Sequence, residues 1–389
     1  MALSIERISD IGSLEALAPE WDALAAELSP RVPFAGALWN ILWWKHFRER
    51  RRAVRDDLFV HVLRDPMKHL VAVAPMMLTR RPAVGPFQIR VAQFFGADPN
   101  LTEIRGLVCR PRDQAAVVTA LSRHLLAQAG EWDWVRWCGL RGDVPPPAAT
   151  AALRRLHRNE PDYYLPLPAS WEEFRAGLRR NIKESLRKCY NSLKRDGYGF
   201  ELRVVARAED LAAALERLWQ LHTARASCAA QVRHADVFRA PRSRMFLAEY
   251  AAQMAARGQL RMFQLHVSGA VVATRMGFVL GSELYLYYSG YDPAWAGYSV
   301  ATTLLAETIR WAIAQGLQTV NLSTGNDVSK TRWNPVEVPL HGGLQLAPHR
   351  RGRLAMLAYG KVLGLAQAGS PLGVLMAQAS RGGGFWQTR

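Results

Sequence analysis

The most informative stretch of this sequence is Leu284-Tyr-Leu-Tyr-Tyr-Ser-Gly-Tyr-Asp-Pro-Ala-Trp-Ala-Gly-Tyr-Ser-Val-Ala-Thr-Thr-Leu-Leu305. Its first residues predict a strand, Pro293 and Gly297 predict a loop, and the apolar spacing after Ser299 predicts a helix. That helix is expected to end before Gly316, and a short strand is expected at residues 319–322. Because the first amides of a helix have no intrahelical acceptor, this order of elements predicts an anion-binding site at the helix N-terminus.

The neighbouring segments indicate that the chain repeats one plan twice. In the second half, a hairpin is expected from strands at 260–267 and 271–280, ahead of the strand that starts at Leu284. The first half shows the same order of elements, with strands at 58–63, 70–78 and 89–95, a helix at 112–128 and a strand at 132–140. Further helices are expected at 13–28, 34–47 and 149–158. The repeat is one of pattern, not of residue identity, and it predicts an internal duplication.

Length and pattern together predict the fold class and the domains. A chain of 389 residues is expected to form two domains. We predict an α+β or α/β fold with two tandem domains, each a mixed, mostly antiparallel sheet flanked by helices. The domains are expected at residues 1–165 and 166–345, followed by a basic, apolar tail at 346–389. Only the second domain has the Gly- and Tyr-rich loop before its helix, so we expect function there and a degenerate first domain.

Composition limits the partners and the compartment. A net charge of +17 favours an anionic partner, which is a nucleic acid, a phosphorylated cofactor or an acidic membrane surface. The four cysteines lie far apart without paired spacing, so neither a zinc site nor a disulfide framework is indicated, and no metal is expected. The N-terminal residues lack the pattern of a signal peptide, which predicts a cytoplasmic protein.

Two helices between the repeated sets carry charged groups. Residues 171–195 have one apolar stripe, formed by Leu178, Ile182, Leu186, Cys189 and Leu193. The remainder of that helix is basic, and this face is either solvated or binds an anion. A second helix, at 210–225, carries His222 on its apolar stripe, with Arg225 close by in sequence. A histidine in this position is either a satisfied core residue or a functional one.

The C-terminal tail is basic and apolar. No acidic residue follows Glu337, and residues 362–380 are uncharged but interrupted by polar residues and a proline. That pattern is too broken for a membrane-spanning helix. The tail is expected either to lie on an anionic membrane surface or to pack as a C-terminal helix on the second domain.

These motifs together resemble the CelD-type acyltransferases of the GNAT superfamily. The resemblance is carried in the second half by Tyr288–Trp295, Tyr298-Ser299, Leu304-Leu305, Gly316, Gly325, Lys330–Trp333, Arg179–Arg187 and Leu221-His222 with Arg225. In the first half it is carried by Trp39, Trp43-Trp44, His46-Phe47 and Val71–Pro75. It covers nearly the whole chain except the tail. The family is similar to the FemAB peptidyltransferases in having two GNAT-like units in tandem, so the resemblance implies two GNAT-like domains.

Three positions depart from the family pattern. Asn321 stands where the family usually has an acidic residue at the start of the last strand. Val300-Ala301 replaces the usual Pro-Gly after Tyr-Ser, which leaves a small residue that still lets backbone approach a phosphate. Ser329 replaces the usual tyrosine before the lysine and so removes a phenolic acid.

The resemblance implies transfer of an acyl group from a thioester, typically acyl-CoA, to an amine. Family members are linked to the synthesis of cellulose, exopolysaccharide and envelope lipids, so the expected acceptor is an envelope-related lipid amine or amino sugar. The expected partners are acyl-CoA, this amine and an anionic membrane surface at the inner face of the membrane, whereas nucleic acid is not expected. No metal cofactor is implied.

Acyl transfer to an amine needs a polarised thioester carbonyl, a neutral amine and a proton for the departing thiolate. Six residues are expected to bind the cofactor: Tyr298, Ser299, Ala301, Thr302, Arg179 and Lys183. Four are expected to take part in catalysis: His222, Tyr287, Asp292 and Lys330. His222 suits a base because the ordinary histidine pKa is about 6.5. Three are expected to bind substrate: Tyr288, Asp327 and Trp333. The alternative for Asp292 is a structural role in the turn before Pro293. The alternative for Trp333 is packing in the protein core instead of contact with substrate.

Two further functions remain open at this stage. One is a FemAB-like peptidyltransferase that uses aminoacyl-tRNA, with RNA bound by the basic helix. The other is a non-catalytic GNAT-like module of envelope biosynthesis, because Asn321 stands in the place of an acid.

Overall fold

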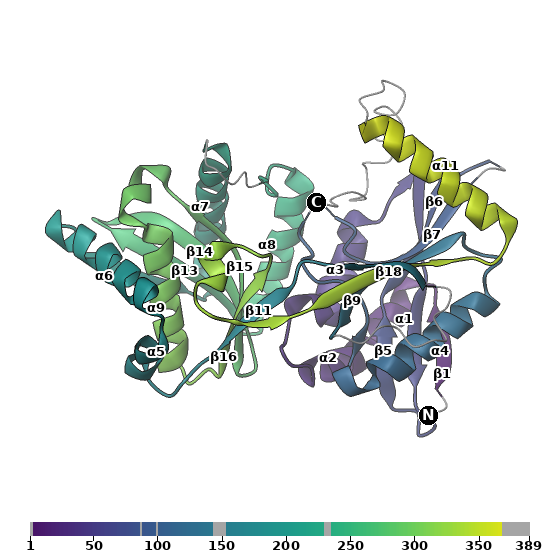
Figure 1. Cartoon of the computed structure of the whole chain (residues 1–389), viewed down its shortest axis with the longest axis horizontal. Coiled ribbons are helices and arrows are strands. Elements are labelled where there is room, and N and C mark those ends of the chain that lie inside the picture. Colours follow the sequence, from purple (N-terminus) through teal and green to yellow (C-terminus); the bar gives the residue numbers. More distant parts are fainter. Residues whose placement is uncertain (1–2, 86–87, 99, 143–152, 229–234, 368–389) are drawn as a thin grey trace. The chain divides into compact units, whose positions relative to one another are not determined.

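The computed structural model describes residues 3–85, 88–98, 100–142, 153–228 and 235–367, and it divides into two compact units. Unit 1 contains residues 1–29, 34–159 and 339–389, and unit 2 contains residues 30–33 and 160–338. Figure 1 shows that each unit is built on strands covered by helices. The predicted boundary near residue 165 lies inside a strand of unit 2, and unit 1 includes the segment that follows residue 338.

Unit 1 contains two sheets. Its helices are α1 (Ile11–Ala16), α2 (Ala18–Ala26), α3 (Ala37–Phe47), α4 (Gln114–Ala127) and α11 (Arg350–Gln367). Its strands are β1 (Ser4–Ile8), β2 (Arg50–Arg51), β3 (Val54–Leu58), β4 (Val60–Arg64), β5 (Leu70–Ala74), β6 (Met76–Arg81), β7 (Ile89–Phe94), β8 (Val108–Cys109), β9 (Trp134–Arg141), β10 (Leu153–Arg158) and β18 (Leu340–Leu346). The described strands form one sheet in the order β1-β4-β5-β8 and another in the order β10-β18-β9-β7-β6-β3-β2. Only β7 and β9 of these strands pair in parallel.

The hairpin expected at 58–78 passes between the two sheets of unit 1. Each predicted strand is divided, the first at Phe59 and the second at Pro75, so that β4 and β5 enter one sheet while β3 and β6 enter the other. Pro75 lacks an amide hydrogen, which suits a position where a ladder stops. Phe59 is fully buried and its amide donates to the Met76 carbonyl. The sequence pattern located these strands but not the break within each one.

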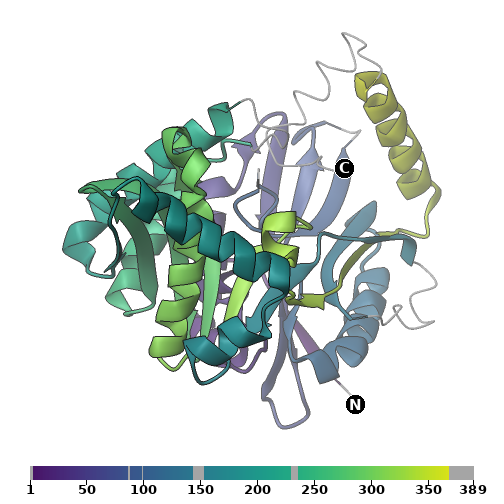
Figure 2. The same cartoon turned by 60° about the vertical axis from the view of Figure 1, so that its left-hand side comes forward.

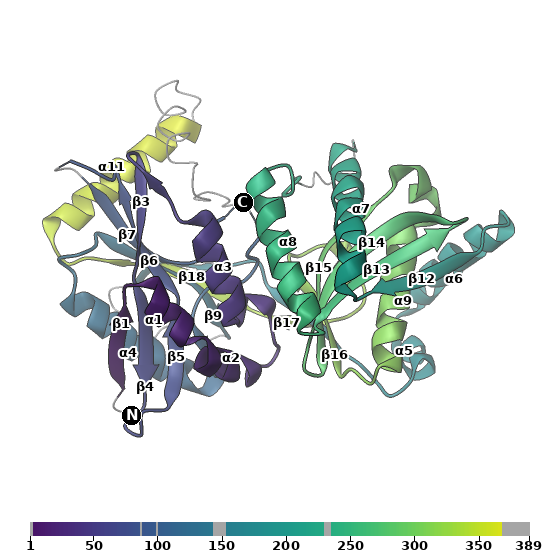
Figure 3. The same cartoon turned by 180° about the vertical axis from the view of Figure 1, so that it is seen from behind.

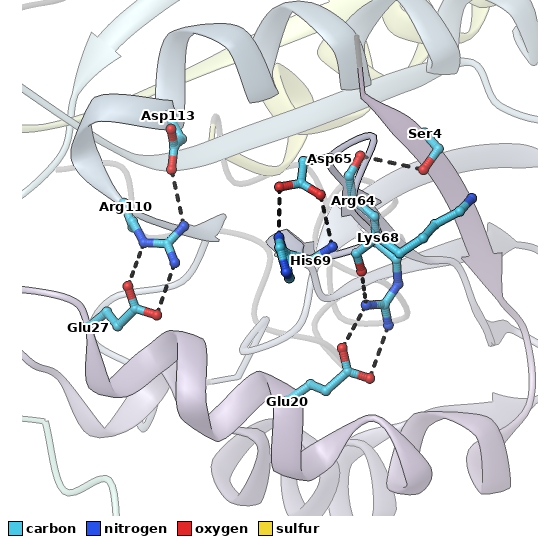
Figure 4. A network of polar contacts seen from close by, with 9 residues as sticks. All are labelled: Ser4, Glu20, Glu27, Arg64, Asp65, Lys68, His69, Arg110 and Asp113. Carbon is cyan, nitrogen blue, oxygen red and sulfur yellow. Dashed lines mark hydrogen bonds and ion pairs between the residues drawn. The ribbon is translucent and has the colours of Figure 1, made fainter. Parts of the chain in front are cut away.

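Helix α2 is tied to the smaller sheet of unit 1 by two arginines. Arg64 at the end of β4 binds both carboxylate oxygens of Glu20, and Arg110 after β8 does the same with Glu27, as Figure 4 shows. The nearest N–O distance is 2.6 Å in each pair. Both glutamates are about half exposed, so these pairs orient α2 more than they stabilise it. The apolar side of the helix, with Trp21 and Leu24 buried, contributes the larger share.

The described strands of unit 2 form a single sheet with helices on both faces. Its helices are α5 (Trp171–Gly177), α6 (Arg180–Arg195), α7 (Ala208–Ser227), α8 (Pro241–Ala256), α9 (Val300–Ala314) and α10 (Val328–Thr331). Its strands are β11 (Asp162–Pro166), β12 (Phe200–Val205), β13 (Leu260–Val267), β14 (Ala270–Leu280), β15 (Glu283–Tyr291), β16 (Thr319–Thr324) and β17 (Val336–Val338). Their order in the sheet is β12-β13-β14-β15-β16-β11-β17, and among them only β15 and β16 pair in parallel.

The helices of unit 2 cover opposite faces of this sheet. Figure 2 shows α6 crossing α9 on one face, and Figure 3 shows α7 and α8 on the other. The predicted apolar stripe of α6 is confirmed, because Leu178, Ile182, Leu186, Cys189 and Leu193 are all buried. Leu284 and Leu286 of β15 pack with α9 in the same core cluster. The first turn of α5 carries the Ser170 cap, whose hydroxyl accepts from the amide of Glu173.

Both large sheets share the order expected for a duplicated plan. In unit 1, β3, β6, β7, α4 and β9 occur in the same order as β13, β14, β15, α9 and β16 in unit 2, although β4, β5 and β8 of the smaller sheet lie between them along the chain. In each case a helix connects the two parallel strands. The predicted mixed, mostly antiparallel sheets flanked by helices are therefore confirmed.

The expected helix at 149–158 is wrong where the structure describes it, because residues 153–158 form strand β10. That strand pairs with β18, which lies nearly 200 residues further along the sequence. Residues 143–152 lie outside the described part of the chain.

The C-terminal helix α11 packs on unit 1, so the alternative of a helix packed on the second domain is wrong. Ala355 and Met356 contact the cluster of Val91 and Trp134, and Arg351 donates to the Gln88 carbonyl. Residues 368–389 of the expected tail lie outside the described residues. Within the described residues, no helix combines the length and the apolar character needed to cross a bilayer.

Candidate functional site

The parallel strands β15 and β16 separate part-way along their length. They pair at Glu283–Tyr285 with Thr319–Asn321, and β15 then continues to Tyr291 and β16 to Thr324. In unit 1, by contrast, β7 ends only one residue beyond its last pairing with β9, at Phe94. Unpaired backbone groups on two facing strands are free to hydrogen-bond a ligand that lies between them. Of the two units, unit 2 thus has the longer separated segment.

A β-bulge lies on β15 just beyond the point of separation. Arg275 of β14 pairs with Ser289 and Gly277 pairs with Leu286, so Tyr287 and Tyr288 together face the single residue Met276. Strict alternation predicts these tyrosines on opposite faces of the sheet, but their ring centroids lie 4.6 Å apart. The bulge therefore brings both rings to the face covered by α7 and α8. There Tyr287 contacts Phe278, and Tyr288 contacts Phe238 and His222.

The loop from β15 leads directly into the N-terminus of α9. Residues 293–298 form the 3-10 turn η4, which Asp292 caps by accepting from the amide of Ala294 at 3.0 Å. Ser299 then adopts a left-handed conformation with φ 54°, and α9 begins at Val300. The helix start expected near Ser299 is confirmed. The amides of Val300 and Ala301 have no acceptor among the described backbone groups, and Ala301 is exposed.

A polar patch lies beside this helix start. Arg332, which follows α10, donates to the Thr302 hydroxyl at 3.0 Å. The Cys189 thiol of α6 lies against the Ser299 hydroxyl, and burial raises the pKa of that thiol. Burial likewise lowers the pKa of Arg332, and its buried Nε has no hydrogen-bond partner. A cation and free amides of a helix terminus together suit a phosphate group. Arg332 was missed as a site residue because only the tertiary structure brings it to α9.

His222 lies behind Tyr288, on the buried side of α7. Its Nδ1 is 3.1 Å from the Ser289 carbonyl oxygen. A carbonyl oxygen only accepts, so Nδ1 carries the hydrogen and the lone pair is on Nε2, which is buried. Burial lowers the pKa of His222, against smaller opposing effects of the Ser289 carbonyl and Asp236. The imidazole is thus held neutral near pH 7.

The close approach of α7 to β15 depends on Gly290. A Cβ at this residue would lie 2.4 Å from the His222 amide nitrogen and 2.5 Å from the Leu221 carbonyl carbon. Both are backbone atoms, so the space cannot be made by a side-chain rotation. Glycine at this position therefore lets α7 present His222 and Arg225 to β15.

Lys330 and Asp327 lie near the end of β16. The Lys330 ammonium donates to the Ser323 hydroxyl at 2.9 Å and to the Thr324 carbonyl. Asp327 caps α10 by accepting from the Ser329 amide at 2.7 Å. Both residues are half-buried.

Asn321 is paired with a buried acid on the neighbouring strand. Its side-chain amide donates to the Asp162 carboxylate at 2.8 Å, and its carbonyl oxygen accepts from the Ser323 amide. Asp162 on β11 is fully buried. The position that resembled a missing acid thus has a carboxylate beside it, supplied by another strand.

Four predicted site residues have contacts within the fold of unit 2: Arg179, Lys183, Trp333 and Tyr298. Arg179 donates to the Asn334 side chain, and Lys183 donates to the Ala176 carbonyl in α5. Trp333 is buried in the core of unit 2 and stacks on Phe174, so the packing alternative describes its position. The Tyr298 hydroxyl donates to Asp196 at the end of α6 at 2.9 Å. Tyr298 therefore connects η4 to α6.

Residues 178–331 match the family described as the acetyltransferase (GNAT) domain. Over these residues the chain is similar to GNAT acetyltransferase domains. Its limits include α6, the sheet from β12 to β16 and α9. The separated strands and the free helix N-terminus both lie inside this match. Among the described residues, no group of three or more metal-ligating side chains is found.

Several solved structures are similar to nearly the whole chain. The crystal structure of FemX has a TM-score of 0.57 at 11% identity, and the match covers 91% of this chain and 99% of that one. The structure of L-PGS from Bacillus licheniformis has a TM-score of 0.46 at 12% identity, covering 90% and 96%. A tandem GNAT protein from the clavulanic acid biosynthesis pathway has a TM-score of 0.40 at 12% identity, covering 90% and 100%. At this identity the similarity to FemX concerns the fold. No curated protein matches the sequence.

Proposed function

We propose that unit 2 is a thioester-dependent N-acyltransferase. The observation that carries this proposal is the separation of β15 from β16 beyond Tyr285, next to the free amides of α9. The pantetheine arm of the donor would extend between the two strands, and its phosphates would bind the amides of Val300 and Ala301 together with Arg332. GNAT domains, which residues 178–331 match, transfer an acyl group to an amine.

The reaction has simple requirements. The amine nitrogen attacks the thioester carbonyl, a tetrahedral intermediate forms, and the C–S bond breaks to release a thiolate that takes a proton. A backbone amide of the unpaired part of β15 would polarise the carbonyl. His222 would accept the proton of the amine, because its lone pair is on Nε2 and its pKa is lowered. Tyr287, buried at the bulge, would protonate the thiolate.

Acyl-CoA is the donor that fits this account. A 3′,5′-diphosphoadenosine group would add contacts beyond the α9 amides, and the exposed basic residues of α6 lie on the same face of the sheet. As in the CelD-type acyltransferases that the sequence resembles, the acceptor would be an envelope-related lipid amine or amino sugar. A peripheral position at an anionic membrane would suit the basic charge of the chain.

The basic face of α6 also supports a second candidate, transfer from aminoacyl-tRNA. Seven basic residues in and next to this helix are exposed: Arg179, Arg180, Lys183, Arg187, Lys188, Lys194 and Arg195. Within α6 and at its C-cap the acids are Glu184 and Asp196, and each is paired with an arginine. RNA binding would then weaken steeply with added salt. Salt-insensitive or absent tRNA binding would remove this candidate.

The proposal is tested by thiol release. Acyl-CoA of several chain lengths is supplied with a panel of amines, and free CoA is measured with a thiol reagent. We expect release that depends on the amine and an amide product of the matching mass. If no combination of acyl-CoA and amine releases CoA, and calorimetry detects no CoA binding, unit 2 would instead be a non-catalytic GNAT-like module.

A further inference from the structure

The outer side of helix α11 combines apolar and basic side chains. Arg350, Leu354, Leu357 and Lys361 follow one another at steps of three or four residues, so they lie along one side of the helix. Leu354 is 66% exposed and Leu357 is 63% exposed, and both cations are exposed as well. Arg353, next to Leu354 in the sequence, is exposed beside them. These five residues form what we call the outer stripe of α11.

The opposite side of α11 is held against unit 1. Gly352 is buried, and a Cβ there would lie 2.9 Å from the Asp133 carbonyl oxygen, so the first turns of the helix approach the chain before β9 closely. Ala355 and Met356 contact the apolar cluster formed by β7 and β9. Figure 1 shows the helix at the margin of unit 1. These contacts determine that the outer stripe faces away from the sheet.

The charge of the outer stripe is not balanced along the helix. The sequence contains no acidic residue after Glu337. Arg351, on the flank of α11, lies 3.6 Å from Asp133, a fully buried acid that Arg90 also binds. A basic surface favours an anionic partner, and two large exposed leucines favour an apolar one. The partner should therefore offer both kinds of surface.

An anionic bilayer has both features. Its lipid phosphates attract arginine and lysine, and the boundary between headgroups and acyl chains accepts leucine side chains from a helix that lies in the membrane plane. A nucleic acid would use the cations, but its phosphate backbone has no apolar layer for the leucines. A second copy of a chain with a net charge of +17 would bring like charge to a basic surface.

We propose that the outer stripe of α11 binds the surface of an anionic membrane. Leu354 and Leu357 would enter the headgroup boundary, with Arg350, Arg353 and Lys361 against lipid phosphates. The helix would lie on the bilayer and not cross it, since no described helix has the length and apolar character of a span. The inference concerns a partner and does not depend on acyl transfer, because vesicle binding is measured without substrates.

Vesicle binding by the whole chain tests the inference. The probes are vesicles of phosphatidylcholine alone and vesicles of phosphatidylcholine mixed with phosphatidylglycerol, and flotation measures the bound fraction. The wild-type protein is expected to bind the anionic vesicles at least about tenfold more tightly than the neutral ones, because each cation near an anionic surface contributes about fivefold. Added salt should weaken this binding, since it screens the cations.

A leucine pair tests the apolar part of the stripe. Leu354→Ser combined with Leu357→Ser should lower the affinity for anionic vesicles about tenfold or more, by loss of the apolar area that enters the bilayer. Met245→Ser is the matched control, because Met245 is 63% exposed on α8 of unit 2. The control should bind vesicles as the wild-type protein does. Equal losses in the leucine pair and the control would contradict the proposal.

An arginine pair tests the basic part. Arg350→Gln combined with Arg353→Gln should lower the affinity for anionic vesicles about twentyfold. Arg187→Gln combined with Lys188→Gln removes the same charge from exposed positions on α6 and is the control. The control should lose less affinity than the α11 pair. Equal losses would mean that the net charge, and not the outer stripe, determines the binding.

The remaining outcomes distinguish other partners. No vesicle binding, or equal binding to neutral and anionic vesicles, would overturn the inference. A loss in the arginine pair without a loss in the leucine pair would indicate a polyanion such as RNA and would also overturn it. So would a wild-type dimer in light scattering that the leucine pair converts to a monomer. Thiol release with a water-soluble amine should be the same in the leucine pair and the wild type, so the proposed function is judged separately.

Discussion

Replacing Gly290 by alanine tests how α7 is held against β15. The added Cβ would lie 2.4 Å from the His222 nitrogen, whereas ordinary contact begins at 3.4 Å, so the difference of 3.4 − 2.4 requires α7 or β15 to move by about 1.0 Å. Overpacking of a core costs about 1–3 kcal/mol, and opposing backbone atoms place this case at the upper end. Such a shift also displaces His222 and Arg225, and a displacement of about 1 Å near the chemistry lowers activity on the order of a hundredfold.

The measurement combines hydrogen exchange with kinetics. Amide exchange of peptides from α7, read by mass spectrometry, should become faster in Gly290→Ala, and kcat/KM for acyl transfer should fall. Gly199→Ala is the matched control, because a Cβ there meets no atom within 4 Å and the backbone is not left-handed. That control should keep its stability or gain about 0.4–1 kcal/mol. If Gly290→Ala behaves like Gly199→Ala in both assays, α7 does not depend on this contact.

Three other substitutions report on separate parts of the structure. Arg332→Gln should weaken CoA binding about tenfold, by loss of a charge-assisted contact to phosphate, and unchanged calorimetric affinity would place the phosphates elsewhere. Asp292→Asn should keep both the η4 cap and activity within about twofold, because an amide oxygen also accepts from Ala294, whereas a loss of about a thousandfold would assign a proton-transfer role to Asp292. Burial lowers the pKa of His61 from 6.5 to about 3. Between these pH values the imidazole is protonated in the unfolded chain but not in the folded protein, so the stability of the fold decreases as the pH falls. Between about pH 6.5 and pH 5 the wild-type protein should therefore lose about 2 kcal/mol more unfolding free energy than His61→Phe. Urea titrations at these two pH values that give equal losses for both proteins would contradict this.

The sequence predicted the elements whose signals are local. Strands β13 to β16 and helix α9 have clear periods, and Pro293 and Gly316 mark the ends of the loop and the helix. The apolar stripes of α6 and α7 were predicted for the same reason, since each lies within one helix. Trp39, Trp43 and Trp44 of α3, which carry part of the family resemblance, are buried.

Features that depend on distant partners were not predictable in this way. Residues 153–158 place two leucines three apart, as a helix would, but β18 provides a strand for them to pair with. The bulge on β15 reverses the expected orientation of Tyr288, because it depends on the register with β14. Asp162 and Arg332 reach the site from β11 and from the end of α10, and no local motif links either residue to α9 or to Asn321.

The central claim is that the N-terminus of α9 binds the phosphates of an acyl-CoA. Calorimetry of CoA binding with Ala301→Glu and Ala314→Glu tests it most directly, because the two variants add the same charge to exposed positions at opposite ends of one helix. We predict that the wild-type protein and Ala314→Glu bind CoA alike and that Ala301→Glu binds at least about tenfold more weakly, since a carboxylate would then oppose the phosphates. Equal affinity in all three proteins, or no CoA binding by the wild type, would contradict the claim.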